Sequence, residues 1–320
     1  MPLLLILLCF SSALAQEKKL RKMTVGYVLA SSAYASLFVA KEARILEKHG
    51  LDASLIFLGT GSLAVSALLA GDVNVLRGTP AAVVQAQAQG APLVILGSEY
   101  DVLTFKLIVR PEIREAKDLK GRKLGIARFG DTGDYATRRA LQYLGLDPQR
   151  DVTILQAGGQ TARLAALQAK ALDGTVVNPP NDLIMKEVGF HELVDISRLA
   201  LPYLGNTYAV TQATLKSQPD AVEGFARAMV EGIAHFKTHK EETLKVLRKY
   251  LRVTDQKMLE ATYEFIKQFT VDVPIPRADG LAVMLDIMAR ETGTKPKVDP
   301  ASFIDATLVK KIISKREIAP

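Results

Sequence analysis

The stretch that decides the fold is residues 23–50, MTVGYVLASSAYASLFVAKEARILEKHG. Apolar side chains alternate with other residues from Met23 to Leu29, which is typical of a half-buried strand. After a short break of small and polar residues, Tyr34–His49 carries apolar side chains at helical spacing and ends at Gly50, a residue suited to the left-handed conformation that closes a helix. The stretch therefore predicts a strand, a polar turn and a helix, in that order.

The same order of elements continues along the next part of the chain. The predicted strands are 54–58, 73–76 and 93–96, and the predicted helices between them are 63–70 and 81–89. Strands that alternate with helices imply βαβ crossovers, which build a mostly parallel sheet. The first part of the chain is therefore predicted to be an α/β unit.

A second copy of this unit follows. Its predicted strands are 123–127, 152–156 and 174–177, and its predicted helices are 134–144 and 162–169. The two halves align directly, because His49–Asp52 corresponds to Leu144–Asp147 and Gly59–Ser62 corresponds to Gly158–Thr161. Two copies are too few for a solenoid, which needs at least three repeats. We therefore predict an α/β fold with two similar lobes, each a mostly parallel sheet flanked by helices.

The division of the chain follows from this repeat. We expect residues 23–110 to form the first part of lobe I, residues 111–203 to form lobe II, and residues 204–320 to complete lobe I. The last part begins with a strand at 207–211 and continues with helices at 219–238, 240–250, 255–269 and 277–292. The chain would then cross between the lobes near 107–119 and near 199–208, and two crossings make a hinge.

Composition excludes several classes of protein. A chain of 320 residues exceeds the usual size of a single core, and its 48% hydrophobic residues argue against disorder. The net charge of +7 favours anionic partners, but the basic residues are interspersed and form no block with interleaved aromatics. We expect no nucleic-acid partner.

Residues 1–15 have the pattern of a signal peptide. Leu3–Phe10 is apolar but shorter than the roughly 20 residues that span a bilayer, and Ala13–Ala15 has the small residues that a signal peptidase accepts. We expect cleavage before Gln16 and export of the mature chain to the periplasm. A buried N-terminal element and a lipid anchor on Cys9 are the alternatives. Cys9 is the only cysteine, so cleavage would leave a chain without thiol chemistry.

The sequence offers little for catalysis. Of four histidines, only His235 and His239 have the spacing of a metal pair, and no third ligand is recognisable near them. No dinucleotide fingerprint, Walker lysine motif or nucleophile elbow is present. We therefore expect a protein that is not an enzyme and has no catalytic residues, metal or cofactor.

The turns that follow the strands are small, hydroxyl-bearing or rich in glycine. In an open α/β sheet such turns meet at one edge, where the free N–H groups of helix N-termini hold anionic groups. Any one of these turns could be only a helix cap, whereas several on one edge favour a ligand site. The predicted ligand-binding residues are Ser31, Ser32, Tyr34, Gly61, Ser62, Gly78, Thr79, Gly130, Thr132, Asp134, Asn178 and Pro179.

Two arginines complete the predicted site. Arg77 and Arg128 follow strand ends, where a guanidinium could clasp a carboxylate or sulfonate with paired hydrogen bonds. Each could instead form a surface or interlobe ion pair, and which of the two faces the cleft is left open. Asp131 and Asp134 could cap a helix or accept from an N–H group of the ligand.

Tyrosines could also close over the site. The candidates are Tyr34, Tyr100 and Tyr208, with packing as the alternative for Tyr100.

Several motifs resemble one family of receptors. They are Ala40–Glu42, His49–Leu51, Ala67–Val73, Gly90–Leu93, Lys117–Lys123 and Gly145–Pro148. The chain resembles the substrate-binding proteins of ABC importers in the nitrate/sulfonate/taurine family, whose fold is shared by thiamin-pyrimidine synthase. The sequence departs from this family at Asn74, where aspartate is common, and at Lys170, where glycine is common.

The resemblance implies a periplasmic binding protein-like fold of type II. Such a receptor captures a small anionic or zwitterionic organic solute by lobe closure and presents it to an ABC permease in the inner membrane. Sulfonate, nitrate, carboxylate and pyrimidine solutes all remain open. We expect a monomer in which Ser62, Thr79 and Thr132 hold the anion and Asn178 bridges the lobes. The alternatives are an enzyme on the same fold, acting on a pyrimidine or a chorismate-derived compound, and a solute sensor for a membrane receptor.

Overall fold

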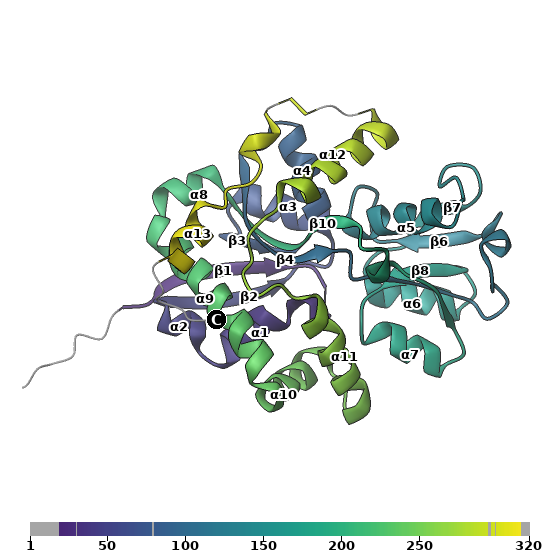
Figure 1. The fold of residues 1–320 in the computed structure, drawn as a ribbon, viewed down its shortest axis with the longest axis horizontal. Coiled ribbons are helices and arrows are strands. Elements are labelled where there is room, and N and C mark those ends of the chain that lie inside the picture. The colour runs from purple at the N-terminus through teal and green to yellow at the C-terminus, as the bar shows by residue number, and fades with distance from the viewer. Residues whose placement is uncertain (1–18, 30, 79, 294–295, 298, 315–320) are drawn as a thin grey trace, which may run out of the picture.

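Two five-stranded sheets form the two lobes of the molecule (Figure 1). The computed structural model describes residues 19–29, 31–78, 80–293, 296–297 and 299–314. The expected signal peptide, 1–15, and the predicted ligand residue Thr79 lie outside the described residues. Within the described ranges, no helix is long and apolar enough to cross a membrane.

The sheet of lobe I has the strand order β2-β1-β3-β10-β4. Its strands are β1 (Arg21–Tyr27), β2 (Leu51–Phe57), β3 (Val75–Arg77), β4 (Leu93–Val102) and β10 (Pro202–Thr211). Strand β1 pairs in parallel with β2 and β3, so that Val25 lies opposite Leu55 on one side and Val75 on the other. Strand β10 is antiparallel to both of its neighbours, β3 and β4.

The sheet of lobe II repeats this plan with the order β7-β6-β8-β5-β9. Its strands are β5 (Lys106–Val109), β6 (Lys123–Ile126), β7 (Thr153–Gln156), β8 (Gly174–Val177) and β9 (His191–Asp195). Strands β6, β7 and β8 are parallel, and β5 is antiparallel to β8 and β9. Each sheet thus has one antiparallel strand, which is the strand that begins just after the chain enters that lobe. The predicted mostly parallel sheets are confirmed.

The first crossing between the lobes lies earlier than the sequence indicated. Strand β4 runs in the first sheet to Val102, and β5 already pairs in the second sheet from Lys106, so the chain crosses at 103–105 and not at 107–119. No glycine or proline marks this crossing, which leaves no break in the sequence pattern to find it by. The chain returns through η3 (Ile196–Leu199) into β10, within the predicted range of 199–208.

Helices cover both sheets. Those of the first part are η1 (Ser32–Tyr34), α1 (Ala35–Glu42), α2 (Ile45–Lys48), α3 (Gly61–Ala70) and α4 (Pro80–Ala88). Those of lobe II are η2 (Ala116–Leu119), α5 (Thr132–Tyr143), α6 (Gln160–Gln168) and α7 (Asn181–Glu187). The helix predicted over 34–49 corresponds to the end of η1 followed by α1 and α2, and α1 and α2 are separate because Arg44 between them has a left-handed φ of 55°.

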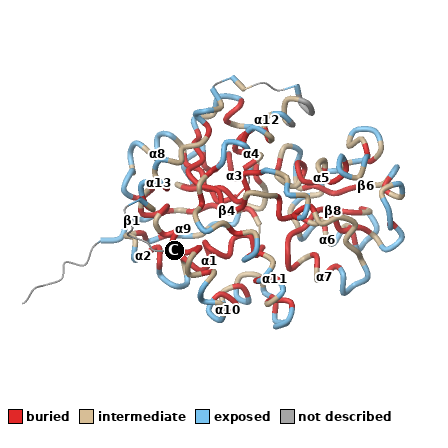
Figure 2. Tube along the Cα trace, in the orientation of Figure 1, coloured by how far each residue is buried: buried red, intermediate tan, exposed pale blue. Residues whose placement is uncertain are grey.

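The C-terminal part is helical and packs mainly on lobe I (Figure 1). It comprises α8 (Gln212–Ser217), α9 (Pro219–Thr238), α10 (Lys240–Leu251), α11 (Gln256–Phe269), α12 (Ala278–Thr292), η4 (Pro300–Ser302) and α13 (Thr307–Ser314). Helix α9 lies close against α1, since a Cβ on Gly232 would come within 2.9 Å of the Ser36 carbonyl oxygen. Buried residues run along the strands at the centre of each lobe (Figure 2).

Candidate functional site

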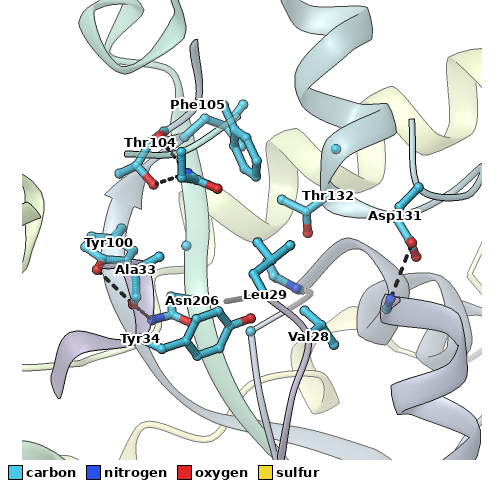
Figure 3. A pocket seen from close by; sticks show the side chains of 18 of the residues that line it. Val28, Leu29, Ala33, Tyr34, Tyr100, Thr104, Phe105, Asp131, Thr132 and Asn206 are labelled. Carbon is cyan, nitrogen blue, oxygen red and sulfur yellow. Dashed lines mark hydrogen bonds between the residues drawn. The ribbon is translucent and has the colours of Figure 1, made fainter. Parts of the chain in front are cut away.

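A cavity of about 70 Å³ lies between the two lobes, and we call it the cleft. Lobe I contributes Val28, Leu29, Ala33, Tyr34, Gly59, Thr60, Gly61, Gly78, Pro80, Tyr100, Val102, Tyr203, Gly205 and Asn206. The first crossing contributes Leu103, Thr104 and Phe105, and lobe II contributes Ala127, Asp131, Thr132, Gly133, Arg163 and Asn178. Figure 3 shows Phe105, Thr132, Leu29 and Tyr34 around the space. Most of this lining is apolar or aromatic.

The cleft forms where strands end, which is the position expected of a ligand site in an open α/β sheet. Val28 and Leu29 follow β1, and Gly78 follows β3. In lobe II, Ala127 follows β6 and Asn178 follows β8. The structure therefore brings turns of both lobes together, because the carboxyl ends of the parallel strands in each sheet face the other lobe.

Four contacts join the lobes across or beside the cleft. The Ser32 hydroxyl donates to the Pro179 carbonyl oxygen at 2.7 Å. The Tyr203 hydroxyl donates to Thr132 Oγ1 at 3.2 Å, and the exposed Arg128 reaches Ser62 Oγ at 3.3 Å. The fourth contact is between Asp131 of lobe II and the backbone N–H of Gly61 in lobe I, at 3.3 Å. The described lobes are therefore closed on each other.

Asp131 occupies the N-terminus of α3, the place where the sequence predicts the ligand's anion. The Gly61 N–H donates to Asp131 Oδ2 at 3.3 Å (Figure 3), and the Ser62 N–H lies beside the same carboxylate. Burial raises the pKa of Asp131 from 3.8 to about 6, although these N–H groups and Arg128 act to lower it. The protein thus places its own carboxylate where a helix N-terminus favours a negative charge.

The raised pKa of Asp131 predicts a pH dependence of stability. A carboxyl whose pKa is higher in the folded state stabilises the fold at low pH, and this contribution is lost as the pH rises from about 4 to about 6. We expect the free energy of unfolding of the wild type, minus that of Asp131→Asn, to fall by about 1–3 kcal/mol over this range. Urea unfolding of both proteins at several pH values measures it. A difference that stays constant or increases with pH would contradict the assignment.

The prediction for Arg77 needs correction, because this side chain lies outside the cleft lining. It is fully buried in lobe I, where its NH2 group lies 2.6 Å from Glu99 Oε1 and its NH1 group donates to the Asn206 carbonyl oxygen at 2.8 Å. The same network includes Ser36, whose hydroxyl donates to Glu99. Arg77 therefore supports Asn206, which lines the cleft, and does not line the cleft itself.

Arg163 is the cation that the structure places in the cleft and that sequence reasoning missed. It is 2% exposed and donates to Thr175 Oγ1 at 2.9 Å and to two backbone carbonyl oxygens, of Gly158 and Val176. Among the described residues, no carboxylate forms an ion pair with it at hydrogen-bonding distance. Burial lowers the pKa of Arg163 to about 10. Its place in a short amphipathic helix gave no sign that it would be turned inward.

Other predicted residues hold the turns in place. Ser31 is buried, and its side chain caps η1 by accepting from the Ala33 N–H at 3.1 Å. Asn178 donates to the Thr104 carbonyl oxygen at 2.7 Å, which fixes the first crossing against lobe II. Tyr34 lines the cleft and covers Gly78 so closely that no side chain fits between them.

Besides Arg77, eight predicted residues are not part of the cleft lining: Ser31, Ser32, Ser62, Arg128, Gly130, Asp134, Pro179 and Tyr208. Asp134 accepts from the Gly130 N–H at 2.9 Å and pairs with Arg138 at 2.7 Å. Asp134 and Gly130 line a second, larger hollow of about 670 Å³ between α4, α5 and α12, which Asp131 also borders. Tyr208 packs in the core beside Arg77, whereas Tyr100 lines the cleft and donates to the Ala33 carbonyl oxygen at 3.0 Å.

Comparison with known proteins extends this description. The family model described as NMT1/THI5 like matches residues 31–243. The chain is 27% identical to a binding protein of Brucella abortus over 307 residues, which cover 92% of each chain. The alkanesulfonate-binding protein SsuA from Xanthomonas axonopodis pv. citri, bound to MOPS, has a similar structure (TM-score 0.73, 18% identity, covering 91% of this chain and 97% of that one). The nitrate-binding protein NrtA from Synechocystis also has a similar structure (TM-score 0.75, 14% identity). The match covers 94% of this chain and 90% of that one.

Proposed function

The chain belongs to the NMT1/THI5-like family, and from this premise we propose that it is the solute-binding component of an ABC importer. In this proposal the exported, monomeric protein captures a small anionic or zwitterionic organic solute in the cleft, without changing it chemically. It then presents the solute to a permease in the inner membrane. The similarity in fold to the sulfonate- and nitrate-binding proteins supports this function.

The observation that carries the proposal is the shared lining of the cleft. Tyr34, Tyr100 and Asn206 come from lobe I, and Asp131, Arg163 and Asn178 come from lobe II. A solute that touches both groups binds the closed form more tightly than the open form, and this difference in affinity shifts the population toward closure. A permease can then distinguish the loaded receptor by its shape.

A solute screen tests this function. Sulfonates, carboxylates, nitrate and nitrogen heterocycles are added to the mature protein, and thermal stability is measured together with the radius of gyration by small-angle X-ray scattering. We expect at least one solute to raise the melting temperature and to reduce the radius of gyration. A solute that binds without any change in the radius of gyration at any concentration would contradict closure as the mechanism.

Ser32→Ala provides a matched test of closure. The variant removes the interlobe hydrogen bond to the Pro179 carbonyl oxygen, which only the closed form makes, so we expect the Kd of the solute to rise by about 3- to 10-fold. Ser66→Ala is the control, because the exposed Ser66 bonds only within α3. Isothermal titration calorimetry compares the two variants. Equal affinities would show that the Ser32 contact does not contribute to closure.

A further inference from the structure

Three oxygen atoms on residues that line the cleft have no hydrogen-bond partner in the described part of the chain. They are Oδ1 of Asp131, Oδ1 of Asn178 and Oδ1 of Asn206. These residues are 5%, 0% and 8% exposed, so the three oxygens lie in the protein interior. Buried polar atoms are nearly always paired, and an unpaired one is destabilising. Three unpaired acceptors around one cavity indicate that the bound solute supplies the donors.

The chemistry of the partners fixes which end of each amide is the free one. The Asn178 amide nitrogen donates to the Thr104 carbonyl oxygen, which can only accept. The Asn206 amide nitrogen donates to the Ala33 carbonyl oxygen and, at 3.3 Å, to a carboxylate oxygen of Glu99. Exchanging the nitrogen and oxygen of either amide would set an acceptor against an acceptor. The unpaired atom of each amide is therefore its oxygen, which can accept a hydrogen bond.

Asp131 also has one acceptor oxygen without a hydrogen-bond partner, for a different reason. Its Oδ2 accepts from the Gly61 N–H at the start of α3, and its Oδ1 is the free acceptor. Arg163, on the same lobe, has an opposite charge, so one carboxylate and one guanidinium line the cleft. This balance does not favour a simple anion, since the attraction of Arg163 is opposed by Asp131.

The rest of the lining defines the shape and polarity of the solute. Rings of Tyr34, Tyr100, Phe105 and Tyr203 line the cleft. Such walls suit a flat ring, which can pack against aromatic faces and edges. We propose that the solute is an aromatic ring compound with amino or other N–H groups, which donate to Asp131, Asn178 and Asn206. This inference rests on the proposed function of the cleft as a solute site.

Matched pairs of compounds test the inference on the wild-type protein. Each pair has the same ring and differs by an amino or a methyl group: 4-aminopyrimidine against 4-methylpyrimidine, and 4-aminobenzenesulfonate against 4-methylbenzenesulfonate. Nitrate and ethanesulfonate represent anions without N–H donors. By calorimetry at about pH 8, where Asp131 is ionised, we expect the amino member of at least one pair to bind about tenfold more tightly than its methyl counterpart and than both anions.

Asp131→Asn tests the direction of the hydrogen bonds. Its amide oxygen can still accept from the Gly61 N–H, so its NH2 group takes the place of the free oxygen. We expect the preference for the amino compound to fall by about tenfold. Asp147→Asn is the control, because it also removes a lobe II carboxylate that caps a backbone N–H but does not line the cleft. The control should keep the wild-type preference.

The outcomes separate this inference from the proposed function. Equal binding of amino and methyl compounds, tighter binding of nitrate or ethanesulfonate, or failure of every amino compound to bind at millimolar concentration would overturn the inference. Each of these results leaves the receptor function to the closure experiment with other solutes. If Asp131→Asn does not fold, the affinities of the matched compound pairs for the wild-type protein still test the inference.

Discussion

Replacing Arg77 by methionine is expected to lower the free energy of unfolding by about 3–5 kcal/mol. Arg77 is fully buried and lies 2.6 Å from Glu99, which is 1% exposed. Methionine fills most of the space but leaves the Glu99 carboxylate buried without its cation. A buried charge that loses its partner is much more destabilising than the loss of an exposed pair. Urea unfolding followed by far-UV circular dichroism measures the effect.

Two further variants test whether the unpaired Glu99 charge causes the loss of stability in Arg77→Met. Arg128→Met removes an exposed guanidinium from the interlobe contact and should change stability by less than about 1 kcal/mol. The double variant Arg77→Met with Glu99→Met removes both charges and should recover much of the loss, because apolar side chains of similar volume often replace a buried pair well. A loss below about 1 kcal/mol in the single variant would show that Glu99 finds another partner.

Gly78→Ala should destabilise the protein by about 2–5 kcal/mol. Gly78 has a φ of +90°, where an alanine is strained by about 1–2 kcal/mol. Its Cβ would also lie 2.0 Å from the Tyr34 hydroxyl oxygen, and such overpacking adds about 1–3 kcal/mol. Tyr34 has little room to move, since it is 2% exposed and packs against the rings of Tyr27 and Phe38.

Gly71→Ala separates the two causes. Gly71 has a similar φ of +84°, but nothing lies within 4 Å of the position of its Cβ. This variant should therefore show only the backbone strain, about 1–2 kcal/mol. The difference between the two variants, measured by thermal and urea unfolding, reports the contact with Tyr34. Equal losses would mean that Tyr34 moves aside freely.

Local patterns were sufficient for the plan of the fold. The alternation over Met23–Leu29 predicted β1, and the helices predicted over 219–238, 240–250, 255–269 and 277–292 appear with nearly the same limits. The resemblance to the nitrate/sulfonate/taurine receptors is confirmed by the family match and by the structural neighbours. These features are readable because burial of one face leaves a periodic pattern in the sequence.

Other elements left no such pattern. The short strands β5 and β9 were not predicted, and β5 was instead assigned to the end of lobe I. Both pair with strands that are distant in the sequence. The identity of a strand's neighbours is decided by tertiary pairing, which a local window does not contain.

The sequence alone determined two duplicated α/β lobes and the turns at their strand ends, because periodicity and turn chemistry are local properties of a chain. Only the tertiary structure decided which polar groups meet. It buried Arg77 against Glu99, turned Arg163 toward the cleft, and set Asp131 on the N-terminus of α3 in the other lobe. Charge and hydrogen-bond partners depend on distances of a few ångströms between segments far apart in sequence, and folding alone sets these distances.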